Sequence, residues 1–285
     1  MSATTKAQDV PLPEDAATAP SVLVHGGRVL PAVTVDTYNE ELRDEDGFVG
    51  DRASRRAFHA ILADWRDRLK ERGEDPFGDI PMEGISKSRL DKMPNAGDPV
   101  SAGLVHTVVG EFAGELATVI RRFLRLDTWK DTQRIVIGGG MIGSRIGELA
   151  MGRTGIILAA DGIKIELAAI QNDPEEAGLI DRAKQEKIKL APFMGIGCPG
   201  LIDEQGSILK GGQNLPGNWE GKSFNLAAAL SAHLPRIDGH EIFIQIHNDA
   251  VVQGLSEVPN MKDVEHWGVM TIGTGLGNAR FTNRE

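Results

Sequence analysis

The chain of 285 residues has one cysteine, Cys198, and one tyrosine. A single thiol cannot form a disulfide within the chain, so an apolar core has to hold the fold, as in proteins of a reducing compartment. The sparse His and Cys residues form no pattern typical of a metal site. We therefore expect a cytoplasmic protein without a protein-bound metal centre.

Positive charge is also scarce, because 31 Lys and Arg face 41 Asp and Glu, which gives a net charge of -10. Binding to nucleic acid needs a basic surface, so we expect no nucleic-acid partner. No apolar stretch approaches the length that spans a bilayer, and residues 1–21 carry acids but no apolar signal core. We expect neither a membrane partner nor a signal peptide.

Apolar segments of two periods alternate along the rest of the chain. Residues 1–21 are rich in Ala, Pro, Thr and acids and are expected to form a disordered tail. Helices are expected at 52–72, 101–126, 174–187 and 223–234, strands on both sides of 25–27 and at 134–140, 164–170, 191–200, 241–249 and 266–277, and a turn-rich surface excursion at 73–99. This order predicts an α/β protein with a mixed or parallel sheet covered by helices.

Glycine is abundant, with 34 residues, and three glycine-rich loops each follow an expected strand: 138–143, 195–200 and 273–277. Backbone N–H groups of such loops can approach a phosphate, but a tight turn that packs a helix on a strand has the same pattern. The first loop also matches a dinucleotide-binding fingerprint, with Asp161 placed as the acid that binds a ribose. An NAD-dependent oxidoreductase therefore stays open as an alternative.

Polar residues gather at two further places. Asn248 and Asp249 end an apolar strand, where Asp249 could be a general base and Asn248 could bind hydroxyls, although Asn and Asp there also favour a helix N-cap. In the segment "GGQNLPGNWEGKSF", Trp219 and Asn214 could line a sugar pocket, or the segment could be a surface loop with a packed Trp.

Four motifs in the C-terminal part resemble the ROK family (repressors, open reading frames and sugar kinases). They are "MGIGCPGLIDEQGSI", "NLPGNW", "HNDAVVQG" and "TIGTGLGNA", and they span residues 193–280 in the order of the family. The resemblance implies a glucokinase-like protein with the actin-like, ribonuclease-H-like ATPase fold, in which two lobes flank a nucleotide cleft. It also implies ATP- and Mg²⁺-dependent phosphorylation of a sugar hydroxyl, on a hexose or an amino-hexose.

The resemblance assigns roles to residues of these motifs. Asp249 corresponds to the catalytic base, and Asn248, Asn214 and Gly200 to residues that bind the sugar. The residues that correspond to the second phosphate loop, which binds ATP, are Gly273, Thr274, Gly275 and Gly277.

Two segments of the N-terminal half, 111–150 and 165–183, resemble the C-terminal part of ordinary family members. The resemblance implies that Gly138, Gly139 and Gly140 meet the adenosine of ATP. The order is rotated, as in a circular permutant, which close natural termini permit. We expect a tail at 1–21, elements of the adenosine-side lobe at 22–184, and sugar-binding and phosphate-binding elements at 185–285. The oligomeric state is open, and a homodimer is one expectation.

The chain departs from the family in three ways: the D-x-G-G-T phosphate loop, the E-x-G-H sugar motif and the zinc-binding cysteines are absent. These departures favour a second hypothesis, a sugar- or nucleotide-binding protein that has lost catalysis. A repressor is disfavoured, because the chain shows no helix-turn-helix pattern and carries the wrong charge.

The missing phosphate loop belongs at the joint between Lys184 and Gln185, where two family-like segments are joined directly. Without its hairpin, the strands at 191–200 and 241–249 would present unpaired apolar edges, which proteins avoid. We hypothesise an inserted segment at this joint that bears the loop and lies beyond the 285 residues of this sequence. The mass of the intact protein would then exceed 30.7 kDa.

Overall fold

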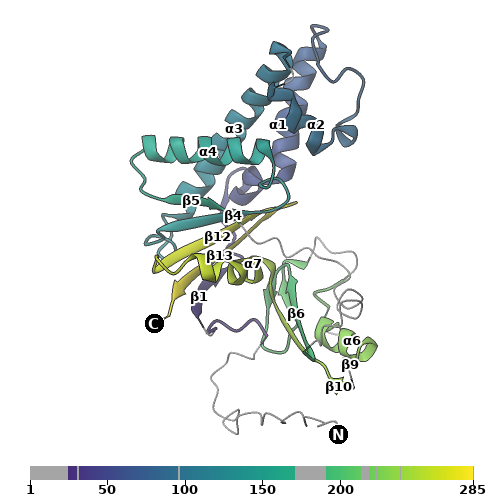
Figure 1. The fold of residues 1–285 in the computed structure, drawn as a ribbon, viewed down its shortest axis with the longest axis vertical. Coiled ribbons are helices and arrows are strands. Elements are labelled where there is room, and N and C mark those ends of the chain that lie inside the picture. Colours follow the sequence, from purple (N-terminus) through teal and green to yellow (C-terminus); the bar gives the residue numbers. More distant parts are fainter. Residues whose placement is uncertain are drawn as a thin grey trace, which may run out of the picture.

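The structure is a computed structural model that describes residues 25–30, 32–95, 97–170, 191–212, 218–221, 224–237 and 239–284. The tail at 1–21, the expected helix at 174–187, the joint at Lys184 and Gln185, and Asn214 lie outside the described residues. Figure 1 shows helices α1 to α4 above a central sheet and a smaller set of strands below it.

The central sheet has five strands in the order β1 (Val33–Tyr38), β13 (Leu276–Asn283), β12 (His266–Ile272), β4 (Arg134–Gly138) and β5 (Glu166–Ala169). β12, β4 and β5 are parallel, while β13 is antiparallel to both β12 and β1. The sheet is therefore mixed. Its first and last strands in sequence are neighbours, so the two ends of the described chain meet here.

The final strand, β13, was not expected from the sequence, which predicted that the chain closes with one strand and a glycine turn. That turn is instead the tip of a hairpin, in which the N–H of Gly273 donates to the carbonyl of Gly275 at 2.9 Å. Ile272 then pairs with Leu276, and Thr271 with Gly277. Glycine weakens the strand signal, so the sequence pattern did not indicate this interior strand of the sheet.

Alternating side chains of the central strands fill two cores, one on each face of the sheet. Ile135, Ile137 and Met270 face the helices α1 (Arg55–Lys70), α3 (Pro99–Phe123) and α4 (Arg145–Ala160). Val136 and Val269 face the opposite side, where α7 (Asp249–Glu257) covers the sheet. The helix expected at 101–126 is confirmed as α3, and one of its faces is buried through these residues: Leu104, Val108, Phe112, Leu116, Val119 and Phe123.

Helix α3 is long and apolar enough to cross a membrane, although the sequence was expected to contain no such stretch. Its most apolar window is 56% buried inside the protein, and core helices pass the same test of length and composition. The finding is therefore weak evidence for a membrane span.

The expected turn-rich surface excursion at 73–99 is correct only in part, because most of its residues are exposed but several of its apolar side chains enter the core. The segment includes the short helix α2 (Lys87–Lys92), and Phe77, Leu90 and Met93 are buried. Arg66 of α1 holds the segment from inside through an ion pair with Asp75 at 3.0 Å. These apolar residues are too widely spaced to show a period, so the sequence resembled a loop.

A second, smaller group of strands lies below α7 in Figure 1. Parallel strands β6 (Phe193–Cys198) and β11 (Phe243–Asn248) carry helix α6 (Leu226–His233) and share a separate core. The remaining strands form short hairpins: β2 (Arg43–Asp44) with β3 (Gly47–Phe48), β7 (Leu201–Ile202) with β8 (Ile208–Lys210), and β9 (Arg236–Ile237) with β10 (His240–Glu241).

Strand β6 was expected to be buried, but alternate residues along it are exposed. Phe193 and Phe243 start the two parallel strands and stack on each other at 5.8 Å between ring centroids, with 49% and 42% of their surfaces exposed. In the described part of the chain, β6 has no strand partner other than β11. This end of the second sheet is therefore open and apolar.

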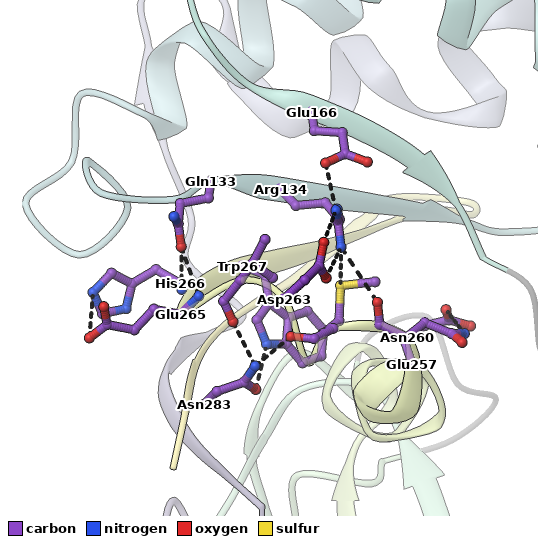
Figure 2. Close-up of polar contacts among 12 residues, drawn as sticks. Gln133, Arg134, Glu166, Glu257, Asn260, Asp263, Glu265, His266, Trp267 and Asn283 are labelled. Carbon is purple, nitrogen blue, oxygen red and sulfur yellow. Dashed lines mark hydrogen bonds and ion pairs between the residues drawn. The ribbon is translucent and has the colours of Figure 1, made fainter. Parts of the chain in front are cut away.

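A polar network ties the central sheet together at the ends where β4 and β12 begin (Figure 2). Arg134 bonds both carboxylate oxygens of Asp263 at 2.8 Å and Glu166 of β5 at 2.7 Å. Hydrogen bonds to these two carboxylates raise the pKa of Arg134, and the bond to Asp263 has the larger effect. Asn283 donates to the carbonyl of Val264 at 2.7 Å. The glycine loops follow the opposite ends of these strands, so this network is structural.

Candidate functional site

Two glycine loops far apart in sequence meet beside the carboxyl ends of β4 and β12. Gly139 has φ +102°, and a Cβ built on it would lie 2.2 Å from the carbonyl oxygen of Ile272. Only glycine permits this approach. The loops at 138–140 and 273–277 are therefore in contact, as the family resemblance requires of parts that bind one nucleotide.

Not every glycine in these loops is needed for packing. A Cβ built on Gly140 or Gly275 would meet nothing within 4 Å. Neither residue has a positive φ. The backbone at these two positions is open toward space that a ligand could enter, which is the condition for backbone N–H groups to bind phosphate.

The first turn of α1 supports the hairpin that contains Thr274. The N–H of Arg55 donates to the carbonyl of Gly273 at 2.9 Å, and Nε of Arg56 donates to the carbonyl of Thr274 at 3.0 Å. Ser54 caps the helix by accepting from the N–H of Ala57. Two arginines thus lie beside the glycine turn, although no sequence motif pointed to them.

Asp249 is the first residue of α7 and lies at the end of β11, as the sequence predicted. Its Oδ1 accepts from the N–H of Ala250 at 2.9 Å and would lie 3.8 Å from a Cβ on Gly277. Burial raises the pKa of Asp249, against the opposing effect of the backbone hydrogen bonds. The carboxylate therefore faces the loop at 273–277 from the second group of strands.

Asn248 caps α7, which is the alternative that its local sequence favoured. Its Oδ1 accepts from the N–H of Ala250 at 3.0 Å, and its Nδ2 donates to the carbonyl of Gly200 at 2.9 Å. The residue is only 1% exposed. Direct binding of a sugar hydroxyl by Asn248 stays a prediction, and in this structure its amide joins α7 to the loop at Gly200.

Gly200 has φ +102°, and a Cβ there would lie 2.3 Å from the carbonyl of Lys210. Close packing thus explains why residue 200 is a glycine. The backbone of Gly200 also lines the first cavity, which is described below. Trp219 packs edge-on against Phe224, with 5.0 Å between ring centroids. Binding of a sugar by Trp219 or by Asn214 stays a prediction.

The first cavity, of about 450 Å³, lies between Asp249, Gly200 and the loop at 273–277. A further part of its wall comes from residues 39–51, which no motif had singled out, and includes Glu40, Glu41 and Asp51. Asn278 holds this wall in place by donating to the carbonyl of Glu40 at 3.0 Å. Arg56 also lines the cavity, beside three acids and Asp249.

The second cavity, of about 440 Å³, lies between α1, α2 and the loop at 138–140. Arg55, His59 and Lys87 line it together with apolar side chains, and no acid among the described residues does so. Nζ of Lys87 donates to the carbonyl of Gly140 at 2.9 Å. Burial lowers the pKa of His59, and the nearby charge of Arg55 lowers it further.

The two cavities share Gly273 and Thr274 in their walls. The glycine turn therefore borders both the basic cavity and the acidic cavity. A two-substrate group transfer needs its two reactants held next to each other, and adjacent cavities are compatible with that requirement.

The dinucleotide interpretation of the loop at 138–143 fits the structure poorly. Asp161, its expected ribose-binding acid, follows the far end of α4, a helix of 16 residues or about 24 Å. There it forms an ion pair with Arg121. The carboxylate of Asp161 is therefore about one helix length from the loop at 138–143, where the dinucleotide was expected to bind.

Within the described residues, no group of three or more His, Cys, Asp or Glu side chains could hold a metal ion. A magnesium ion that arrives with a nucleotide has lower demands, because phosphates and waters supply most of its ligands. Asp51 lines the first cavity and could supply an oxygen. One carboxylate from the protein is enough for a Mg²⁺ whose other ligands come from the nucleotide and water.

Comparisons with known proteins give one distant relationship. No family model matches the chain, and no solved structure matches it. The chain is 29% identical over 93 residues to the glucokinase of Thermotoga maritima, a match that covers 33% of this chain and 27% of that protein. The chain therefore spans about a quarter of the length of this curated relative and has a partial, distant similarity to a sugar kinase.

Proposed function

We propose that the protein transfers the γ-phosphate of ATP to a hydroxyl of a hexose or amino-hexose. The observation that carries the proposal is that two cavities share Gly273 and Thr274 in their walls, with Asp249 lining one cavity and basic side chains lining the other. The partial similarity to a glucokinase supports the same assignment.

The acidic cavity suits the sugar. Carboxylates accept hydrogen bonds from hydroxyls, and Asp249 faces the glycine loop that also borders the second cavity. The sugar hydroxyl oxygen attacks the γ-phosphorus while the bond from that phosphorus to the bridging oxygen of ADP breaks. The hydroxyl proton passes to Asp249, whose raised pKa makes its carboxylate a stronger base than an exposed aspartate.

The basic cavity suits ATP. The apolar side chains between α1 and α2 offer a surface for the base, and Arg55 and Lys87 offer charge for the phosphates. The backbone at Gly275 and Gly140, which is open to solvent space, would offer N–H groups to stabilise charge on the transferring phosphoryl group. Mg²⁺, when bound with ATP, would neutralise part of that charge.

The same account includes an actin-like fold in a circularly permuted order. The pairing of β1 with β13 is compatible with it, since segments that would be consecutive in the ordinary family order lie side by side. A cytoplasmic location and a homodimer belong to the same proposal.

The second candidate is a sugar- or nucleotide-binding protein that has lost catalysis. The absence of D-x-G-G-T and E-x-G-H motifs favours it, and so does Asn248, whose amide is bonded to protein groups. This candidate predicts binding without turnover.

Calorimetric titration of the protein with ATP and with NAD tests the nucleotide assignment. We expect ATP to bind, and we expect Lys87→Ala to weaken ATP binding more than Lys130→Ala, because Lys130 is a surface residue that pairs with Asp127. Binding of NAD without binding of ATP would reject the kinase in favour of an oxidoreductase.

A further inference from the structure

Strand β11 leads directly into Asp249, and its two edges have different partners. Along one edge it pairs with β6, beginning where the N–H of Phe243 donates to the carbonyl of Pro192 at 2.8 Å. In a parallel ladder, N–H groups of alternate residues point to the same neighbour. The N–H groups of Ile246 and Asn248 therefore point toward the opposite edge.

In the described part of the chain, no strand pairs with that opposite edge. The segment His25–Gly27 lies there instead. The N–H of Gly26 donates to the carbonyl of Ile246 at 3.0 Å, and Nδ1 of His25 accepts from the N–H of Ile246 at 3.1 Å. A Cβ on Gly26 would lie 2.3 Å from the carbonyl of Ile202, so the segment fits closely.

The next outward N–H, that of Asn248, is bonded by another imidazole. Nδ1 of His247 accepts from it at 2.8 Å, while Nε2 of His247 lies 3.0 Å from the carbonyl of Gly27. A carbonyl only accepts and an N–H only donates, so both contacts require the neutral ring with its proton on Nε2.

The surroundings favour that neutral form. His247 is 5% exposed and lies edge-on to Tyr38 of β1, with 5.3 Å between ring centroids. Burial lowers the pKa of His247, with a smaller opposing effect from the carbonyl of Gly27. The other titratable groups around this part of β11 are Tyr38 of β1, Cys198 of β6, His25 and Arg28 of the N-terminal segment, and Asp249 of α7. A second proton on Nδ1 would face the N–H of Asn248 and break the contact.

We propose that His247 is a positioning residue of the phosphoryl-transfer site, whose neutral Nε2–H tautomer links the segment His25–Gly27 to Asn248 and so fixes the carboxylate of Asp249. The expected effect on catalysis rests on the proposed function. The expected tautomer of His247 and its contacts do not depend on that function. The short segment His25–Gly27, which the sequence singled out without a role, thereby becomes part of the site.

Nitrogen-15 NMR of the histidine rings in the full chain tests the structural part. We expect His247 to be neutral and protonated on Nε2 at pH 7. In His247→Phe we expect the pKa of Asp249, followed by carbon-13 NMR, to fall toward that of an exposed aspartate. A charged or Nδ1–H ring in the wild type, or an unchanged Asp249 pKa in the variant, would overturn the inference even if no kinase activity exists.

Steady-state kinetics on the best sugar test the functional part. We expect His247→Phe to lower kcat by up to about 10²-fold with little change in the KM for ATP, since small misplacement of a reacting group has such effects. His247→Gln, which retains a donor at the ε position, should recover part of the loss. His25→Phe should give a smaller loss, and His233→Phe on the exposed face of α6 none. Wild-type kcat in folded His247→Phe would contradict the inference while leaving the kinase assignment intact.

Discussion

Some glycines in the two loops are required by the fold, and others are not. Substitution by alanine distinguishes the two kinds. Gly139 is required by the fold, because its Cβ would collide with the carbonyl of Ile272. Gly275 is not required by any contact in the described structure, so its backbone is free to approach a ligand. The sequence pattern alone gave both residues the same interpretation.

We expect Gly275→Ala to keep the wild-type melting temperature and to raise the KM for ATP. Gly139→Ala should instead lower the melting temperature, because a residue with φ +102° and no space for a methyl group is strained. Gly155→Ala inside α4 serves as the control, because a Cβ there would meet nothing within 4 Å. Its free energy of unfolding should rise by up to about 1 kcal/mol, since alanine favours a helix over glycine. Loss of folding in Gly275→Ala would contradict this division.

Asp249 is predicted to lower stability at neutral pH. Burial raises its pKa in the folded state, so the ionised carboxylate is less favourable there than in the unfolded chain. We expect Asp249→Asn to raise the melting temperature at pH 7, and the gain to vanish as the pH falls below the unfolded pKa of about 4. Equal melting temperatures of the two proteins at pH 7 would contradict the burial of the carboxylate.

At the scale of elements, the hydrophobic periodicity of the sequence predicted the main helices, and the polar residues at the end of an expected strand predicted the place of Asp249. The apolar faces of α1 and α3 are present as expected, and Asp249 follows β11. Periodicity could not predict β13, whose glycines weaken the strand signal, or the core contacts of residues 73–99. The wall of the first cavity at 39–51 was also missed, since tertiary contacts such as the bond from Asn278 to Glu40 place it there.

The buried pair of Arg66 and Asp75 should hold the segment at 73–84 against α1. Only 2% and 3% of these side chains are exposed, so removing one partner leaves an uncompensated buried charge. We expect Asp75→Ala to reduce the free energy of unfolding by about 3–5 kcal/mol in urea denaturation. Asp64→Ala, which breaks the exposed pair with Arg68, should cost less than about 1 kcal/mol. Similar losses in the two variants would contradict the role of burial.

At the scale of the whole molecule, the site depends on the contact between two groups of strands. The central sheet supplies both glycine loops, and the second group supplies Asp249 and Gly200. The open apolar end at Phe193 and Phe243 shows that the second group lacks a neighbour in the described part of the chain.

That open end agrees with the hypothesis of an inserted segment at Lys184 and Gln185, which itself lies outside the described residues. Intact-mass spectrometry of the protein should then give a value above 30.7 kDa. A mass equal to 30.7 kDa would reject the insertion and would favour the binding protein over the kinase.

The formation of a sugar phosphate is the most direct test of the account. Wild-type protein and Asp249→Asn are incubated with ATP, Mg²⁺ and a panel of hexoses and amino-hexoses, and the products are identified by mass spectrometry. We expect the wild type to add one phosphate to at least one sugar, and the variant to be slower by about 10²–10⁴-fold, the usual cost of losing a general base. No phosphorylated sugar from the wild type, or equal rates for both proteins, would contradict the account.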